Sequence, residues 1–200
     1  MHSGLKGKGL WWLVFLTSAL PFVYAFYMAL ASTGSDPIKQ VLEYLGVSAF
    51  CFLLITLSMT PIRRLFDVSW SLRFRRMLGL YALFYAVLHA LIYLVLIVDY
   101  SAWLVELTKR PYVLMGVLSL LILLVLGLTS LKSMMRRLGR RWKKVHRWIY
   151  PAAILAWLHM WWQARGGVGE EVLYGLVLLL LLALRVRFFE LFVRKVTHRA

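Results

Sequence analysis

The sequence holds a single cysteine, Cys51, in 200 residues. One cysteine cannot form an internal disulfide, and no CxxC or CxxCH motif indicates a zinc site, a redox pair or covalent haem attachment. A GxGxxG fingerprint is also absent, so the chain has no nicotinamide-binding site of the kind that motif builds. These absences argue against a disulfide scaffold, a c-type cytochrome and an oxidoreductase that oxidises NAD(P)H by itself. Cys51 lies in an apolar segment and is interpreted as a small packing residue.

Long polar stretches are missing as well. The chain is 62% hydrophobic, with a mean hydropathy of +0.76, whereas a soluble domain is roughly half apolar. A transmembrane helix needs about 20 apolar residues. Six segments approach that length: 10–30, 41–60, 78–98, 112–131, 147–163 and 172–189. The pattern predicts an all-α polytopic membrane bundle of six transmembrane helices, which occupies residues 1–200 as a single domain.

Acidic residues are scarce, with 8 Asp and Glu against 24 Lys and Arg. If the N-terminus is cytoplasmic, 20 of the basic residues fall inside and 4 outside. This bias predicts that both termini are cytoplasmic. It also explains the net charge of +16 without nucleic-acid binding. The basic, amphipathic segments 62–76 and 132–144 are expected to lie along the anionic lipid of the inner leaflet.

Ionisable residues are rare inside the predicted spans, and such residues usually mark function. Of five histidines, His2 and His198 lie in the tails. His89 is 13 residues after Arg76, and His159 is 12 residues after Arg147. At 1.5 Å per residue, both histidines lie on the order of 18–20 Å from the cytoplasmic anchors. Two imidazoles at matched depth on helices that run the same way predict bis-histidine ligation of one b-type haem.

His146 is a candidate ligand for a second haem near the inner face. It precedes His159 by 13 residues, which turns an ideal helix about 220° beyond three full turns. Pro151 lies between the two histidines and can loosen the helix. The third span has Arg76, not histidine, 13 residues before His89; an arginine there could pair with a haem propionate. The alternative is that His146 is an interfacial residue that binds a lipid headgroup or a loop carbonyl.

The segments RRMLGLYALFYAVLHALIYLVLIVDY (75–100) and WKKVHRWIYPAAILAWLHMWW (142–162) resemble the MsrQ (YedZ) family. TGSDP (33–37) and LSMTPIRRL (57–65) agree with that family, and the resemblance covers essentially the whole chain. More widely, the sequence is similar to the transmembrane domain of ferric reductases and NADPH oxidases, whose members carry stacked b haems. The histidines of the family correspond to His89, His146 and His159. Arg76 stands where the oxidases carry a fourth histidine.

The resemblance implies a haem-binding subunit of a methionine sulfoxide reductase system in the bacterial inner membrane. Such a subunit is itself non-catalytic. It would take electrons from the quinone pool, with FMN as a further cofactor, and pass them to a periplasmic molybdopterin subunit, MsrP, which repairs oxidised methionines. FMN rests on the resemblance alone, because no local motif for it is found. No internal repeat is evident in the sequence.

Two other classes of protein fit a polytopic bundle. A transporter or channel usually shows several buried polar groups or broken helices, and this chain offers only histidines and scattered Ser and Thr. A purely structural anchor for a partner enzyme needs no cofactor. The colour of the purified protein separates these classes, because only the haem protein would be red.

Overall fold

The structure is a computed structural model that describes residues 3–31, 36–68, 71–98, 109–164 and 169–185, with side chains from residue 8 onward. Within these ranges every regular element is helical, so the predicted all-α class is confirmed. The two tail histidines, most of the predicted loop at 99–111 and the basic residues after Arg185 lie outside the described residues.

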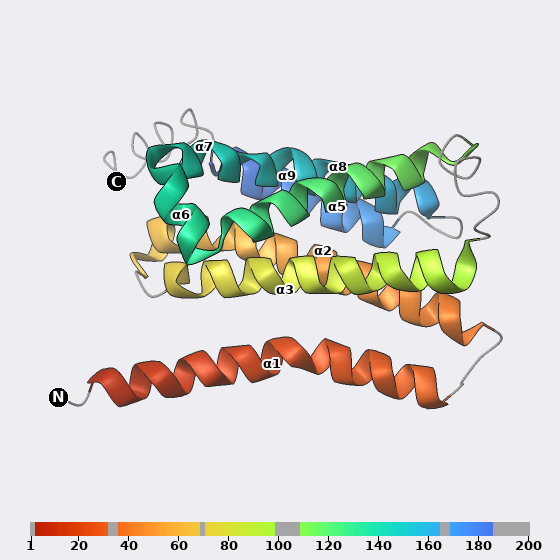
Figure 1. The fold of residues 1–200 in the computed structure, drawn as a ribbon, viewed down its shortest axis with the longest axis horizontal. Coiled ribbons are helices and arrows are strands. Elements are labelled where there is room, and N and C mark those ends of the chain that lie inside the picture. The colour runs from red at the N-terminus through yellow and green to blue at the C-terminus, as the bar shows by residue number, and fades with distance from the viewer. Residues whose placement is uncertain (1–2, 32–35, 69–70, 99–108, 165–168, 186–200) are drawn as a thin grey trace.

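Six long helices coincide with the six apolar segments (Figure 1). They are α1 (Ser3–Ala31), α2 (Pro37–Phe66), α3 (Ser71–Ile92, continued by a π-helical turn, Tyr93–Ile97), α5 (Pro111–Thr129), α8 (Ile149–Gln163) and α9 (Gly169–Ala183). Between α5 and α8 the chain forms α6 (Lys132–Leu138), a 3₁₀ turn (Gly139–Arg141), α7 (Trp142–Val145) and a second 3₁₀ turn (His146–Trp148).

In the part of the chain that the structure describes, four helical segments are long and apolar enough to cross a membrane: Lys8–Ala31, Pro37–Phe66, Ser71–Ile97 and Pro111–Thr129. The regular parts of α8 and α9 have 15 residues each, which corresponds to about 22 Å against a hydrocarbon core of about 30 Å. In α8 the shortening has a local cause, because Pro151 cannot donate to the turn before it and that turn is 3₁₀. Six spans therefore remain a prediction.

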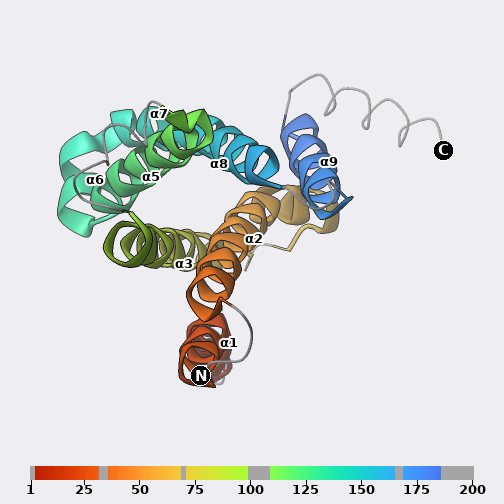
Figure 2. The same ribbon diagram turned by 90° about the vertical axis from the view of Figure 1, so that its right-hand side faces the viewer.

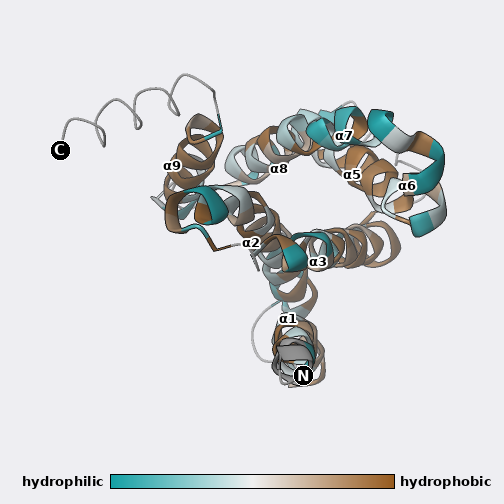
Figure 3. Cartoon of the chain, turned by 90° about the vertical axis from the view of Figure 1, so that its left-hand side faces the viewer, coloured by the Kyte–Doolittle hydropathy of each residue, from teal (hydrophilic) through white to brown (hydrophobic). Residues whose placement is uncertain are grey.

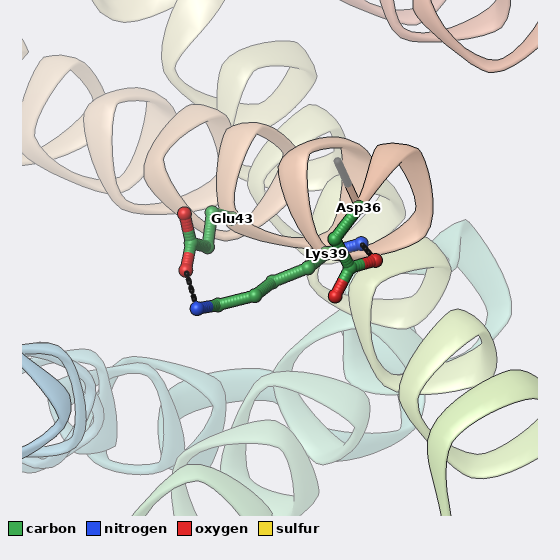
Figure 4. A network of polar contacts seen from close by, with 3 residues as sticks. All are labelled: Asp36, Lys39 and Glu43. Atoms are coloured by element: carbon green, nitrogen blue, oxygen red, sulfur yellow. Dashed lines mark hydrogen bonds and ion pairs between the residues drawn. The ribbon is translucent and has the colours of Figure 1, made fainter. Parts of the chain in front are cut away.

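α2 begins four residues before the predicted segment because Asp36 caps it. The Asp36 carboxylate accepts a hydrogen bond from the Lys39 backbone N–H at 3.1 Å, and Pro37 occupies the first turn, as is common at helix starts. The Lys39 ammonium lies 3.8 Å from Glu43 (Figure 4). At its other end α2 runs to Phe66 and stops at Asp67, which adopts the left-handed conformation that commonly ends helices.

The two basic inner segments are folded differently, and their position along the inner leaflet stays a prediction. The helical residues described in segment 62–76 belong to the end of α2 and the start of α3. The other segment, 132–144, does form short helices of its own, α6 and α7. Polar colouring gathers on α6 and α7, whereas the long helices are mostly apolar (Figure 3).

The helices form two antiparallel pairs, α2 with α3 and α5 with α8, which lie side by side (Figure 2). α1 packs outside the first pair, and α9 packs against α2 and α8. Both α3 and α8 begin at the end of the bundle that holds α6 and α7 (Figure 1). The predicted parallel course of these two helices is therefore confirmed. Large apolar side chains such as Leu16, Leu94 and Leu179 face outward, as a lipid environment requires.

Arg185 ties the end of α9 to α2. Pro61 lacks an N–H, so the Leu57 carbonyl one turn earlier has no donor in its own helix. The Arg185 guanidinium donates to that carbonyl and also to the Tyr150 hydroxyl at 2.7 Å. It lies 5.3 Å from the centre of the Tyr150 ring, within the range of a cation–π contact. One side chain thus joins α2, α8 and the segment after α9.

Tyr85 attaches α1 to the rest of the bundle. It is fully buried, and its hydroxyl donates to the Ser18 carbonyl at 2.6 Å and accepts from the Phe22 N–H at 3.2 Å. In a regular helix these two backbone groups would bond to each other. The hydroxyl inserts between them beside Pro21, where the helix has already lost one backbone donor.

Tyr85→Phe should lower the stability of the protein by about 1–3 kcal/mol, because buried backbone groups lose a partner. The measurement is thermal unfolding in detergent, followed by circular dichroism. Tyr81→Phe is the matched control, since the Tyr81 hydroxyl makes a single bond, to the Phe15 carbonyl, and its side chain is only half-buried. Equal losses in the two variants would contradict a special role for the inserted hydroxyl.

Candidate haem site

The structure brings His89 of α3 and His159 of α8 together. Their ring centres lie 6.1 Å apart and their planes make an angle of 83°. Imidazoles that bind one metal from opposite sides at about 2 Å per bond have ring centres about 6 Å apart, because the centre lies about 1 Å behind the binding nitrogen. The spacing therefore fits two axial ligands of one haem. The structure thus places His89 and His159, the two predicted ligands, next to each other.

Each of these histidines is held by a backbone carbonyl of its partner helix. His89 Nδ1 lies 2.9 Å from the Leu42 carbonyl of α2, and His159 Nδ1 lies 2.7 Å from the Tyr112 carbonyl of α5. A carbonyl oxygen only accepts hydrogen bonds, so each Nδ1 must carry the proton. The remaining nitrogen, Nε2, then keeps a lone pair for a metal. Both rings are thus prepared as neutral ligands.

Two side-chain ligands are what a haem requires, since the porphyrin occupies the other iron positions. Among the described residues no three of His, Cys, Asp or Glu gather closely enough to hold a bare metal ion. The helices near the histidine pair are also packed closely against each other. Ser119 and Ala152 are both buried, and the Ser119 hydroxyl donates to the Ala152 carbonyl at 2.9 Å, which locks α5 to α8. The donor set fits a haem better than a bare ion.

His146 lies at the other end of the α8 segment, in the 3₁₀ turn before Pro151. Its Nε2 is 3.2 Å from the Ser130 hydroxyl, and its Nδ1 is 3.3 Å from the Trp142 carbonyl. The Trp142 ring stacks on it at 3.9 Å. Burial lowers the pKa of His146, the hydrogen bond to Trp142 opposes this, and the charge of Arg75 adds to the lowering. A neutral imidazole results, and both of its nitrogens have protein partners.

Arg76, predicted to contact a propionate, is exposed on α3. Its neighbour Arg75 is half-buried and interacts electrostatically with His146, Tyr150 and Arg185. On α3 the basic residue that faces the interior at this end is therefore Arg75, one position from the predicted one. The roles of Arg76 and His146 toward a cofactor stay predictions.

Sequence reasoning missed the two carbonyl groups that orient the histidines. A signal was present: the residue whose carbonyl accepts the hydrogen bond precedes its histidine by 47 residues in both cases, Leu42 before His89 and Tyr112 before His159. A glycine follows each carbonyl four residues later, at Gly46 and Gly116. The repeated spacing becomes visible only once the helices are paired.

Comparison with known proteins shows the family of the chain. Residues 45–157 match the family described as ferric reductase like transmembrane component. The "Protein-methionine-sulfoxide reductase heme-binding subunit MsrQ" of Xanthomonas oryzae pv. oryzae is 44% identical over 154 residues, which are 76% of this chain and 71% of the relative. The chain belongs to the MsrQ family. The proteins of the same name from Xanthomonas euvesicatoria pv. vesicatoria and Xanthomonas axonopodis pv. citri are each 43% identical over 155 residues, with the same coverage.

Membership of the MsrQ family confirms the resemblance stated from the sequence. The region matched to the ferric reductase like component contains α3, α5 and most of α8, and so includes His89 and His146. It ends two residues before His159. The contact between His159 and His89 therefore comes from the structure and adds to what the family match provides.

Proposed function

We propose that this chain is the haem-binding electron-transfer subunit of a methionine sulfoxide reductase system, with His89 and His159 as the axial ligands of a b-type haem. The observation that carries the proposal is the 6.1 Å separation of two imidazoles whose Nδ1 atoms are both tied to carbonyls. The names of the relatives, which describe heme-binding subunits, support it. Bound haem would supply one-electron transfer at this site.

The route of the electrons is part of the proposal. The chain would span the bacterial inner membrane six times with both termini cytoplasmic, receive electrons from the quinone pool and deliver them to a periplasmic molybdopterin subunit of the MsrP type. The depth of the histidine pair supports an outward acceptor, because His89 and His159 lie far along α3 and α8 from the basic end of the bundle. FMN, and a second haem near His146, belong to the same proposal and rest on the family.

The protein's own residues would do three things. The carbonyls of Leu42 and Tyr112 hold the rings in one tautomer, so that no proton has to leave when a metal binds. The surrounding helices would limit the access of water to the pair, because both ligands are half-buried among them. Arg75 and Arg185 provide positive charge at the cytoplasmic end, where an anionic cofactor group or lipid could be stabilised.

Protein purified from haem-replete cells should be red, and its dithionite-reduced minus oxidised spectrum should be that of a low-spin bis-histidine haem. Planes 83° apart predict a strongly anisotropic low-spin EPR signal. Haem content per chain, measured as the pyridine haemochrome, separates one site from two. A colourless preparation would contradict the proposal and favour a transporter or a structural anchor.

Electron transfer is tested separately with the partner. Quinol should reduce the haem in membrane vesicles, and adding the periplasmic molybdopterin subunit with methionine sulfoxide should reoxidise it. Reduction by quinol without reoxidation would remove the proposed acceptor but keep the haem site.

A further inference from the structure

Two glycines occupy equivalent places beside the two histidines. Gly46 of α2 follows Leu42 by four residues and precedes His89 by 43; Gly116 of α5 follows Tyr112 by four and precedes His159 by 43. The whole set is therefore repeated at an offset of 70 residues. Each helix pair, α2–α3 and α5–α8, presents one carbonyl, one glycine and one histidine in the same order.

The glycines lie against the imidazole rings. A Cβ built on Gly46 would be 3.0 Å from both Cε1 and Nδ1 of His89, and one on Gly116 would be 2.9 Å from Nδ1 of His159. Carbon atoms in ordinary contact are about 3.5–4.0 Å apart. Any other residue at these two positions would therefore push the ring away from its present place.

The position of each glycine explains why the carbonyl is available. In an α-helix the carbonyl of residue i already accepts from the N–H of residue i+4, and the side chain of residue i+4 lies over that turn. With glycine at i+4 the second lone pair of the carbonyl is uncovered. A histidine from the neighbouring helix can then reach it, as His89 and His159 do at 2.9 and 2.7 Å. Glycine in a helix interior is otherwise unfavourable compared with alanine.

We propose that Gly46 and Gly116 are positioning residues: they expose the Leu42 and Tyr112 carbonyls to Nδ1–H of His89 and His159 and so set the tautomer and orientation of both axial ligands. The effect of the glycines on a haem rests on the proposed function. The contacts between the glycines, the carbonyls and the histidines do not depend on it. A strong hydrogen bond from Nδ1–H to a carbonyl makes the imidazole a better electron donor to a metal. A better donor favours ferric over ferrous iron.

The test compares Gly46→Ala and Gly116→Ala with Gly79→Ala. Gly79 lies on α3 with His89, and a Cβ there would make only ordinary contact, 3.5 Å from Thr56 Cγ2. In Gly46→Ala and Gly116→Ala the midpoint potential of the haem should rise, the EPR g values should change, and haem affinity should fall about 10–100-fold, as when an outer-shell partner of a metal ligand is lost. Gly79→Ala should match the wild type in all three measurements.

Unchanged potential and EPR signal in both Gly46→Ala and Gly116→Ala would overturn the assignment, and so would equal changes in Gly79→Ala. A second measurement needs no variant. The apo protein with ¹⁵N-labelled histidine should show His89 and His159 protonated at Nδ1 and bare at Nε2, assigned by single His→Gln variants. Protonation at Nε2 would overturn the assignment whether or not the alanine variants fold.

The two proposals can fail separately. If wild-type protein binds no haem yet shows the Nδ1–H tautomer at both residues, the proposed function fails and the role of the glycines in orienting the rings stands. If haem binds with normal bis-histidine spectra but the tautomer is reversed, the role of the glycines fails and the haem site stands.

Discussion

Replacing His89 or His159 by alanine should abolish the low-spin spectrum of the haem between α3 and α8. Each substitution removes one of two axial bonds and leaves a gap where the ring packs against Gly46 or Gly116. The loss of haem should exceed the 10–100-fold fall in affinity that follows the loss of an outer-shell partner. The measurement is haem content per chain together with the reduced-minus-oxidised spectrum.

The control for this prediction is Tyr112→Phe, which changes the side chain next to His159 but keeps the backbone carbonyl that His159 uses. It should retain the spectrum. His89→Gly in the presence of free imidazole should regain part of it, because the added ring can occupy the vacated position. A His89→Ala or His159→Ala protein with the full low-spin spectrum would show that the ligand pair is wrong.

Replacing His146 by alanine should leave the signal of the outer haem intact while haem content falls or reduction by quinol slows. We expect a reduction rate lower by about tenfold or more if His146 serves an inner cofactor. The Nε2 of His146 lies 3.2 Å from the Ser130 hydroxyl. His146 must therefore give up this hydrogen bond before Nε2 can bind a metal. Stopped-flow reduction by quinol and haem stoichiometry measure the two effects.

Ser130→Ala is the matched variant for His146. It removes the hydroxyl beside Nε2 but keeps the imidazole, so cofactor content should be retained if His146 is a ligand. Normal haem stoichiometry and normal quinol turnover in His146→Ala would assign His146 the interfacial role, in which the Trp142 stack and the Ser130 contact only support the turn before Pro151.

The helical bundle and the matched depth of the two histidines could be predicted, because they follow from the length of the apolar segments and from the rise of a helix per residue. Apolar length predicts helices, and a fixed rise of 1.5 Å per residue converts counts from Arg76 and Arg147 into equal depths. Helix limits were less predictable, because caps decide them. Asp36 starts α2 at Pro37 and left-handed Asp67 ends it, six residues beyond the apolar segment.

The orientation of the rings could not be predicted, since backbone carbonyls are common to all residues and leave no mark in the sequence. In the sequence, only Gly46 and Gly116 indicate which carbonyls a neighbouring side chain can reach. Arg76 illustrates a second limit. One residue along a helix is a turn of 100°, which is enough to leave Arg76 exposed while Arg75 faces the interior. Counting residues along a helix predicts how deep a side chain lies better than it predicts the direction in which the side chain points.

The equal treatment of His89 and His159 has a chemical consequence. Each ring is held by a carbonyl and lies against a glycine in the same arrangement, so the Nε2 atoms of both rings would be available to an iron placed between them as proposed. If His89 and His159 hold a haem iron as proposed, no position on that iron would be left open to dioxygen, carbon monoxide or peroxide. Such a group would supply electron transfer to a protein acceptor, and not reaction with a small ligand at the metal.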